Sequence, residues 1–163
     1  MNMQQSKKYP RRPPRLQSIF SNMNPLFFIT FNTHNRKNIL AEPEIHSTFL
    51  EFCKNAKMMG MIVGNYVIMP DHIHLYVWCE KESSGLKKWI ASMKRKIGKI
   101  LSDKRIERPH WQEGFFDHIL RNSESYIEKS EYISLNPVRA GLCKSKDEWP
   151  YKGKINEIYW PEF

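Results

Sequence analysis

The stretch that decides the fold is YVIMPDHIHLYVW, residues 66–78. Its two apolar runs meet at Pro70-Asp71, a pair typical of a tight turn because proline presets the first central residue. After the turn the side chains alternate, so His72 and His74 share one face of a strand while the aliphatic residues between them share the other. The stretch therefore predicts a β-hairpin with two histidines on one face of its second strand.

The two histidines are candidates for a metal site. Two imidazoles placed two residues apart on one strand face are close enough to bind a single cation. The same pattern also fits two histidines on a half-exposed strand that bind nothing. On residue types alone both interpretations stay open.

Outward from the hairpin, the pattern predicts an α+β fold. A strand rich in Phe, Ile and Thr is expected over residues 24–33, and a helix is expected to begin at Glu42-Pro43-Glu44. After the hairpin we expect a helix with an apolar stripe from Leu86 to Leu101, a fourth strand over residues 110–120, and a third helix that ends near Asn136 because proline follows. This order is the split βαβ pattern with one appended helix, which predicts an antiparallel sheet with two helices on one face.

The bulk composition indicates one globular domain. The chain has 163 residues, 40% of them hydrophobic, and no apolar run approaches the ~20 residues of a membrane helix. Three cysteines far apart fit neither a zinc pattern nor a disulfide framework, and they favour reduced thiols in a cytoplasm. We expect a basic, proline-rich flexible arm over residues 1–23, the main domain over 24–143, and a C-terminal tail packed on it over 144–163.

The charge distribution indicates a polyanionic partner. The net charge is +9, with 26 Lys and Arg against 17 Asp and Glu. Residues 1–41 carry seven basic and no acidic side chains, and residues 86–105 carry eight basic side chains and one acidic one. Nucleic acid is the commonest polyanion, although a merely solubilising basic surface remains the alternative. The candidate DNA contacts are the phosphate-binding Arg11, Arg12, Lys94, Arg95 and Arg121, together with Trp111, which either stacks on bases or packs in the core.

Three stretches together resemble the single-tyrosine HUH transposases, and most closely the proteins associated with repetitive extragenic palindromes in bacteria. The first is VIMPDHIH (67–74), the second is WQ (111–112) followed by DHILRN (117–122), and the third is YISLNPVRAGL (132–142) followed by WPY (149–151). His-x-His alone is unspecific, but its pairing with the third stretch is highly specific. The sequence departs from the family pattern after residue 151, where Lys152-Gly153 replace small hydroxyl residues.

The resemblance implies a ferredoxin-like fold with an added C-terminal catalytic helix. It also implies metal-dependent cleavage and strand transfer of single-stranded DNA at the foot of palindromic hairpins. Tyr132 matches the nucleophile that forms a 5′-phosphotyrosine. His72, His74 and Asn136 match the ligands of Mg²⁺ or Mn²⁺, and a spacing of four puts Asn136 on the same helix face as Tyr132. The implied setting is the bacterial cytoplasm and nucleoid, with no membrane, as a monomer or a homodimer.

Two other functions remain open at this stage. The protein could bind hairpins without cutting them. It could instead be an unrelated metallohydrolase that uses His72, His74 and a third histidine such as His118, and Zn²⁺ would also suit these ligands. A second tyrosine, Tyr126, lies six residues before Tyr132, on a different side of the expected helix.

Overall fold

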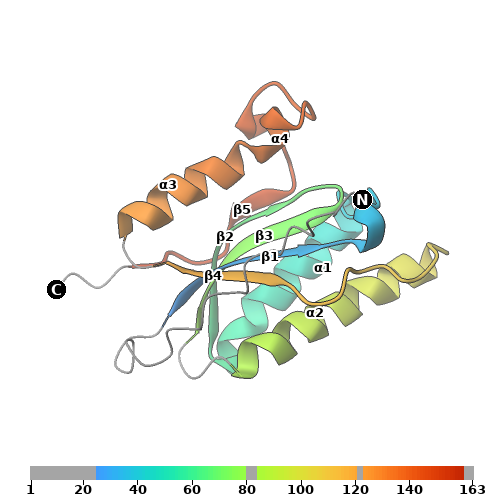
Figure 1. The fold of residues 1–163 in the computed structure, drawn as a ribbon, viewed down its shortest axis with the longest axis horizontal. Coiled ribbons are helices and arrows are strands. Elements are labelled where there is room, and N and C mark those ends of the chain that lie inside the picture. Colours follow the sequence, from blue (N-terminus) through green and yellow to red (C-terminus); the bar gives the residue numbers. More distant parts are fainter. Residues whose placement is uncertain (1–24, 80–83, 121–122, 160–163) are drawn as a thin grey trace, which may run out of the picture.

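A five-stranded antiparallel sheet forms the centre of the molecule (Figure 1). The computed structural model describes residues 25–79, 84–120 and 123–159. The strand order is β4-β1-β3-β2-β5, and every neighbouring pair is antiparallel. The strands are β1 (Leu26–Asn32), β2 (Met61–Ile68), β3 (His72–Cys79), β4 (Phe116–Leu120) and β5 (Lys152–Lys154). The predicted α+β class with a split βαβ sheet is confirmed.

Helices cover both faces of this sheet. They are α1 (Pro43–Lys54), α2 (Ser84–Asp103), α3 (Ser123–Ser134) and α4 (Asn136–Arg139), with short 3₁₀ turns at His34–Arg36, Asn55–Met59 and Lys146–Glu148. In Figure 1, α1 and α2 lie on one side of the sheet, and α3 lies on the other. No helix within the described ranges is both long and apolar enough to cross a membrane.

The alternation of β1 explains how one strand serves two cores. Phe27, Ile29 and Phe31 point toward α1 and α2 and belong to the larger buried cluster. Leu26 and Phe28 point the other way, into a smaller cluster that includes Ile133 of α3. Because both faces of β1 are covered, its sequence reads as a nearly continuous apolar run.

The fourth strand is shorter than predicted. Only Phe116–Leu120 pairs with β1, whereas residues 110–115 form a turn that touches the sheet through a single bridge between Thr33 and Trp111. The Trp111 indole N–H donates to the backbone oxygen of Lys94 at 2.9 Å, and its ring packs at 5.4 Å from the Phe31 ring. In residues 110–115, the hydrogen bond from the Trp111 side chain to α2 therefore holds the chain in place of further strand pairing.

A fifth strand forms in the tail, for which the sequence analysis predicted no strand. β5 pairs with the edge of β2, with Gly153 opposite Tyr66. A side chain at position 153 would come within 3.0 Å of the Tyr66 hydroxyl oxygen, so glycine allows this close approach. The Lys152-Gly153 pair that departs from the family pattern thus forms part of the sheet edge.

The predicted third helix is two helices. α3 ends at Ser134, and α4 begins at Asn136 with Pro137 in its first turn, a favoured position for proline. Tyr132 and Asn136 consequently belong to different helices. The single last turn that was predicted for both residues is interrupted at Leu135, whose backbone is still right-handed helical (φ −88°, ψ −7°). Their position on a common face stays a prediction.

Candidate functional site

His72 and His74 lie together on the sheet face that is turned away from α1 and α2. The register of β3 against β1 puts His74 opposite Thr30 and His72 opposite Asn32. The two imidazole rings meet edge to face, with their centroids 4.6 Å apart. The alternation predicted from the sequence is therefore the one that the strand adopts.

The protein holds both rings through the same nitrogen. Nδ1–H of His72 donates to Oδ1 of Asp71 at 2.6 Å, and Nδ1 of His74 is hydrogen-bonded to the Thr30 hydroxyl at 2.6 Å. In proteins, a metal-binding histidine usually uses its second nitrogen for a contact of this kind, which fixes the orientation of the ring. Nε2 is accordingly the nitrogen that each ring can offer to a cation.

The electrostatics keep the rings neutral, as metal ligation requires. Burial lowers the pKa of His74 to about 3, with His72 and Arg36 adding to the effect. Burial also lowers the pKa of His72, while the Asp71 carboxylate acts in the opposite direction. Two neutral imidazoles and an amide oxygen fit Mn²⁺, and Mg²⁺ with its retained waters.

Within the described ranges, no group of three or more His, Cys, Asp or Glu side chains is placed to hold a metal ion. His118 therefore does not complete a three-ligand cluster with His72 and His74. This arrangement disfavours a metallohydrolase built on three histidines.

Asp71 is a functional candidate that the sequence analysis did not assign. Its carboxylate lies between His72 and Arg36, whose Nε is 2.7 Å from Oδ2. Backbone hydrogen bonds tie the preceding loop to the hairpin turn, from the Thr33 N–H to the Asp71 oxygen at 2.9 Å and from the Leu40 N–H to the Pro70 oxygen at 2.9 Å. An acidic residue directly before the first histidine was the available sequence signal.

We expect Asp71→Asn to weaken Mn²⁺ binding by about 10- to 100-fold, the usual range for a residue that supports a metal ligand. The change removes the charge that orients His72 but keeps a hydrogen-bond acceptor, so Asp71→Ala should weaken binding more. Titration with Mn²⁺ followed by electron paramagnetic resonance measures the affinity. The control is Asp147→Asn, an exposed carboxylate 4.0 Å from Lys152. Equal affinities for the Asp71 variants and wild type would contradict the assigned role.

Tyr132 and His74 line the same cavity, which has a volume of about 350 Å³ and lies between α3 and the sheet. Ile133, the next residue along α3, is buried against the sheet and anchors this turn of the helix. The Tyr132 side chain is 61% exposed. The structure thus joins the predicted nucleophile to one of the predicted metal ligands. Tyr126, in contrast, packs edge to face on Tyr76 with ring centroids 5.0 Å apart.

Asn136 is held by Arg139 rather than by the histidines. The Arg139 guanidinium donates to the amide oxygen of Asn136 and, at 2.6 Å, to the backbone oxygen of Tyr132. The guanidinium carbon also lies 3.7 Å from the centroid of the Tyr132 ring. One cation therefore links the two residues across the break between α3 and α4. The sequence analysis quoted Arg139 within a motif but gave it no role.

We expect Arg139→Ala to slow the chemical step by about 100-fold, the typical cost of misplacing reacting groups by roughly 1 Å. Arg139→Lys should recover only part of the rate, since lysine lacks the planar fork that contacts both residues. Single-turnover rates, compared with hairpin affinities measured separately, distinguish positioning from DNA binding. A loss of affinity as large as the loss of rate would mean that Arg139 contacts the DNA instead.

The predicted DNA contacts fall into three groups. Arg11, Arg12 and Arg121 lie outside the described residues. Arg95 is exposed on α2, as a phosphate contact requires. Lys94 and Trp111 are half-buried and engaged within the protein.

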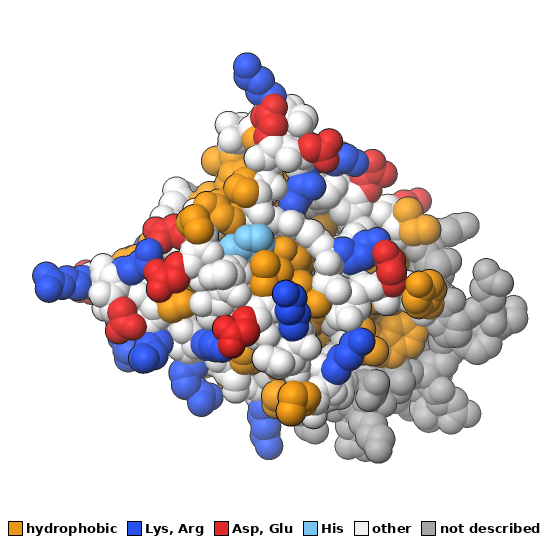
Figure 2. All heavy atoms as spheres, turned by 180° about the vertical axis from the view of Figure 1, so that it is seen from behind, with side chains coloured by type: hydrophobic (Ala, Val, Ile, Leu, Met, Phe, Trp, Pro, Cys, Tyr) orange, Lys and Arg blue, Asp and Glu red, His pale blue; other side chains and the backbone are white. Residues whose placement is uncertain are grey.

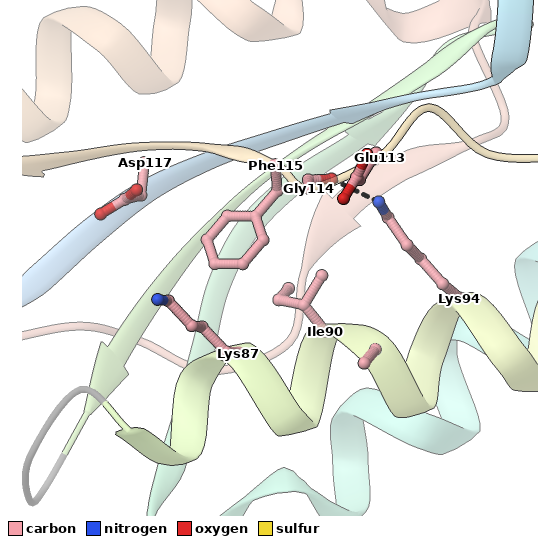
Figure 3. A pocket seen from close by; sticks show the side chains of 8 residues that line it. Lys87, Ile90, Lys94, Glu113, Gly114, Phe115 and Asp117 are labelled. Carbon is pink, nitrogen blue, oxygen red and sulfur yellow. Dashed lines mark hydrogen bonds between the residues drawn. The ribbon is translucent and has the colours of Figure 1, made fainter. Parts of the chain in front are cut away.

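Lys94 bridges α2 to the turn before β4 (Figure 3). Its ammonium group donates to the backbone oxygens of Gln112, at 3.0 Å, and of Gly114. It also lies 5.6 Å from the centroid of the Phe31 ring, and burial lowers its pKa. This lysine is therefore tied to the turn, and its role as a DNA contact stays a prediction, as does base stacking by Trp111.

Acidic neighbours offset part of the basic charge. Lys104 lies 2.6 Å from Glu42, and Lys96 lies 3.6 Å from Glu51. Figure 2 shows basic and acidic side chains interspersed on the face turned away from the view of Figure 1. A count of lysines and arginines along α2 therefore overstates the positive field on the surface.

Known proteins resemble this chain in sequence and in fold. The chain is 26% identical over 127 residues to the REP-associated tyrosine transposase of Escherichia coli (strain K12), which covers 77% of this chain and 73% of the relative. A solved structure of a REP-associated tyrosine transposase bound to a REP hairpin matches the fold with a TM-score of 0.60 and 22% identity, over 86% of this chain and 92% of that one. The family model described as "Transposase IS200 like" matches residues 24–136. Since that match covers more than half of the sequence, the chain belongs to the IS200-like transposase family.

Proposed function

We propose that this protein is a metal-dependent single-stranded DNA endonuclease and strand transferase that forms a 5′-phosphotyrosine intermediate on Tyr132. The observation that carries the proposal is that Tyr132 and His74 line the same cavity. The neutral, pre-oriented imidazoles beside it support the proposal. Membership of a transposase family makes DNA the substrate class.

In the proposed reaction, the Tyr132 hydroxyl oxygen attacks the scissile phosphorus and forms a new phosphorus–oxygen bond to the 5′ side of the break. The bond to the 3′ oxygen breaks, and this oxygen takes a proton from water and leaves as a 3′-hydroxyl group. The phenolic proton is released to water, so the protons balance. The phosphotyrosine conserves the energy of the bond, so attack by another 3′-hydroxyl group can rejoin DNA.

The residues around the tyrosine have distinct roles. Nε2 of His72 and of His74 would hold a Mg²⁺ or Mn²⁺ ion, and the Asn136 amide oxygen would complete the ligand set. A bound divalent cation supplies neutralisation of the scissile phosphate. Arg139 keeps Tyr132 and Asn136 together.

We infer that the DNA partner is a single strand that folds into palindromic hairpins. One similar protein was solved with a REP hairpin, and this chain has a net charge of +9, which favours binding to phosphates. The basic arm and α2 would follow the backbone without reading its sequence. We further propose that the protein acts at the bacterial nucleoid, as a monomer or a homodimer.

The test uses the full chain and single-stranded oligonucleotides from the DNA that flanks its gene, including any palindrome. We expect a protein–DNA adduct that survives a denaturing gel, requires Mn²⁺ or Mg²⁺ and disappears with EDTA. A native gel run in parallel measures binding. Tight binding to palindromic DNA without an adduct at any metal concentration would overturn the proposal in favour of a hairpin-binding protein that does not cut.

A further inference from the structure

The cavity beside Tyr132 has features that phosphate chemistry alone does not require. Four elements, β1, β3, β4 and α3, build it, and its lining includes Phe28, Phe116 and Ile133. A scissile phosphate needs cations and hydrogen-bond donors, whereas these side chains offer apolar and aromatic surface. The cavity therefore has room and chemistry for a second part of the substrate.

Phe116 is, with Tyr132, one of two exposed aromatic side chains that line this cavity. It lies on the edge strand of the sheet, and 57% of its surface is exposed, which is unusual for a side chain of this size. It stands opposite Thr30, and Thr30 in turn stands opposite His74, so the three residues form one row across β4, β1 and β3. Two strand spacings put Phe116 at about 10 Å from His74 along this row.

The volume and charge also suit one nucleotide. A cavity of about 350 Å³ lies at the lower end of the range for small-ligand sites. Lys129 of α3 lines the same cavity and is half-buried, so it offers a positive charge to the backbone of a bound strand. An exposed aromatic ring next to a lysine is the combination with which proteins bind unpaired bases.

We propose that this cavity binds one unpaired nucleobase of the cleaved strand, stacked on Phe116, next to the scissile phosphate. The inference rests on the proposed function, since it takes Tyr132 and His74 as the point where the strand is cut. A base held here fixes the strand along its axis and so selects which phosphate meets Tyr132. The cavity would thereby contribute to the choice of cleavage position, separately from recognition of the hairpin.

The first experiment measures binding without chemistry. The Tyr132→Phe protein is mixed with oligonucleotides that carry 2-aminopurine at one position at a time on either side of the cleavage point. We expect fluorescence to be quenched at one position, and Phe116→Ala to remove that quenching while Phe116→Trp retains it. The control is Tyr159→Ala, which removes another exposed aromatic ring outside this cavity. Quenching that is indifferent to Phe116 at every position would overturn the inference.

The second experiment couples the site to the reaction. Phe116→Ala should slow adduct formation by about 10- to 100-fold on intact DNA, the usual effect of losing one stacked base. Removing the base at the critical position should slow the wild-type protein by a similar factor, and the two changes together should cost no more than either alone. If the rate loss from Phe116→Ala and the rate loss from removing the base multiplied when combined, the inference would be overturned. Failure of the proposed function has a different signature, because no protein would then form an adduct, although the fluorescence result would still be obtained.

Discussion

Tyr132→Phe is expected to eliminate the covalent adduct with single-stranded DNA. The substitution removes one oxygen atom and leaves the ring, its contact with the Arg139 guanidinium and the fold in place. No phosphotyrosine can form without that oxygen, so the rate should fall by at least about 10⁴-fold, in line with the loss of a catalytic nucleophile in other enzymes. A denaturing gel after incubation with Mn²⁺ measures the adduct. Hairpin binding on a native gel should stay within about twofold of wild type, since an exposed hydroxyl contributes little to binding phosphates.

Tyr126→Phe is the matched control for this experiment. Tyr126 lies on the same helix, but it packs on Tyr76, and its hydroxyl donates to Asn65 at 3.4 Å. Its loss should leave adduct formation within about threefold of wild type, because weak hydrogen bonds contribute little to stability. An adduct that persisted in Tyr132→Phe and vanished in Tyr126→Phe would show that Tyr126, and not Tyr132, is the nucleophile.

His74→Ala is expected to give the second largest effect. It removes one of the two imidazoles proposed as metal ligands and should lower the rate of adduct formation by about 10³-fold, equivalent to several kcal/mol of charge stabilisation by the proposed cation. Mn²⁺ affinity should fall in the same variant. Since burial holds the pKa of His74 at about 3, protonation of this ring cannot explain a loss of wild-type activity between pH 5 and pH 7.

His118→Ala tests the competing three-histidine site. His118 lines the cavity with His74 but does not join it in a metal-binding cluster within the described part of the chain. We therefore expect wild-type Mn²⁺ affinity in His118→Ala. Thermal unfolding of His74→Ala and His118→Ala shows whether each variant still folds. This control is needed because the His74 ring stacks on the Phe28 ring, with centroids 5.3 Å apart, so its loss can also destabilise the protein. A loss of Mn²⁺ affinity in folded His118→Ala would support the metallohydrolase instead.

Local patterns predicted the frame of the sheet well. The hairpin predicted around Pro70-Asp71 is formed by β2 and β3, which end and begin on either side of this turn. Alternation and Pro70-Asp71 act over a few neighbouring residues, so they can be read directly from the chain. β5 could not be predicted in this way, because Lys152–Lys154 has no apolar pattern and forms a strand only by pairing with β2.

One face assignment within β2 depended on tertiary structure. The register between β2 and β3 shifts between Val63 and Tyr66, which is the mark of an extra residue in β2. After that shift Tyr66 faces α1 and packs on Phe49 at 4.8 Å between ring centroids, while Val67 faces the histidine side. Gly64-Asn65 lie at the shift, and a glycine inside a strand often marks a bulge. The apolar residues on either side carry no signal for their faces, because each of them can face a core.

The sequence by itself determined the chemistry that is available: two histidines on one strand face, a tyrosine and an asparagine four residues apart, and an excess of basic side chains. These features depend on residue type and near-neighbour spacing. Only the tertiary structure brought His74 of β3 and Tyr132 of α3 to one cavity. It also placed Asn136 in a new helix and brought Arg139 into contact with both Tyr132 and Asn136. Contacts between distant segments depend on how helices pack on the sheet, and short-range sequence patterns do not encode that packing.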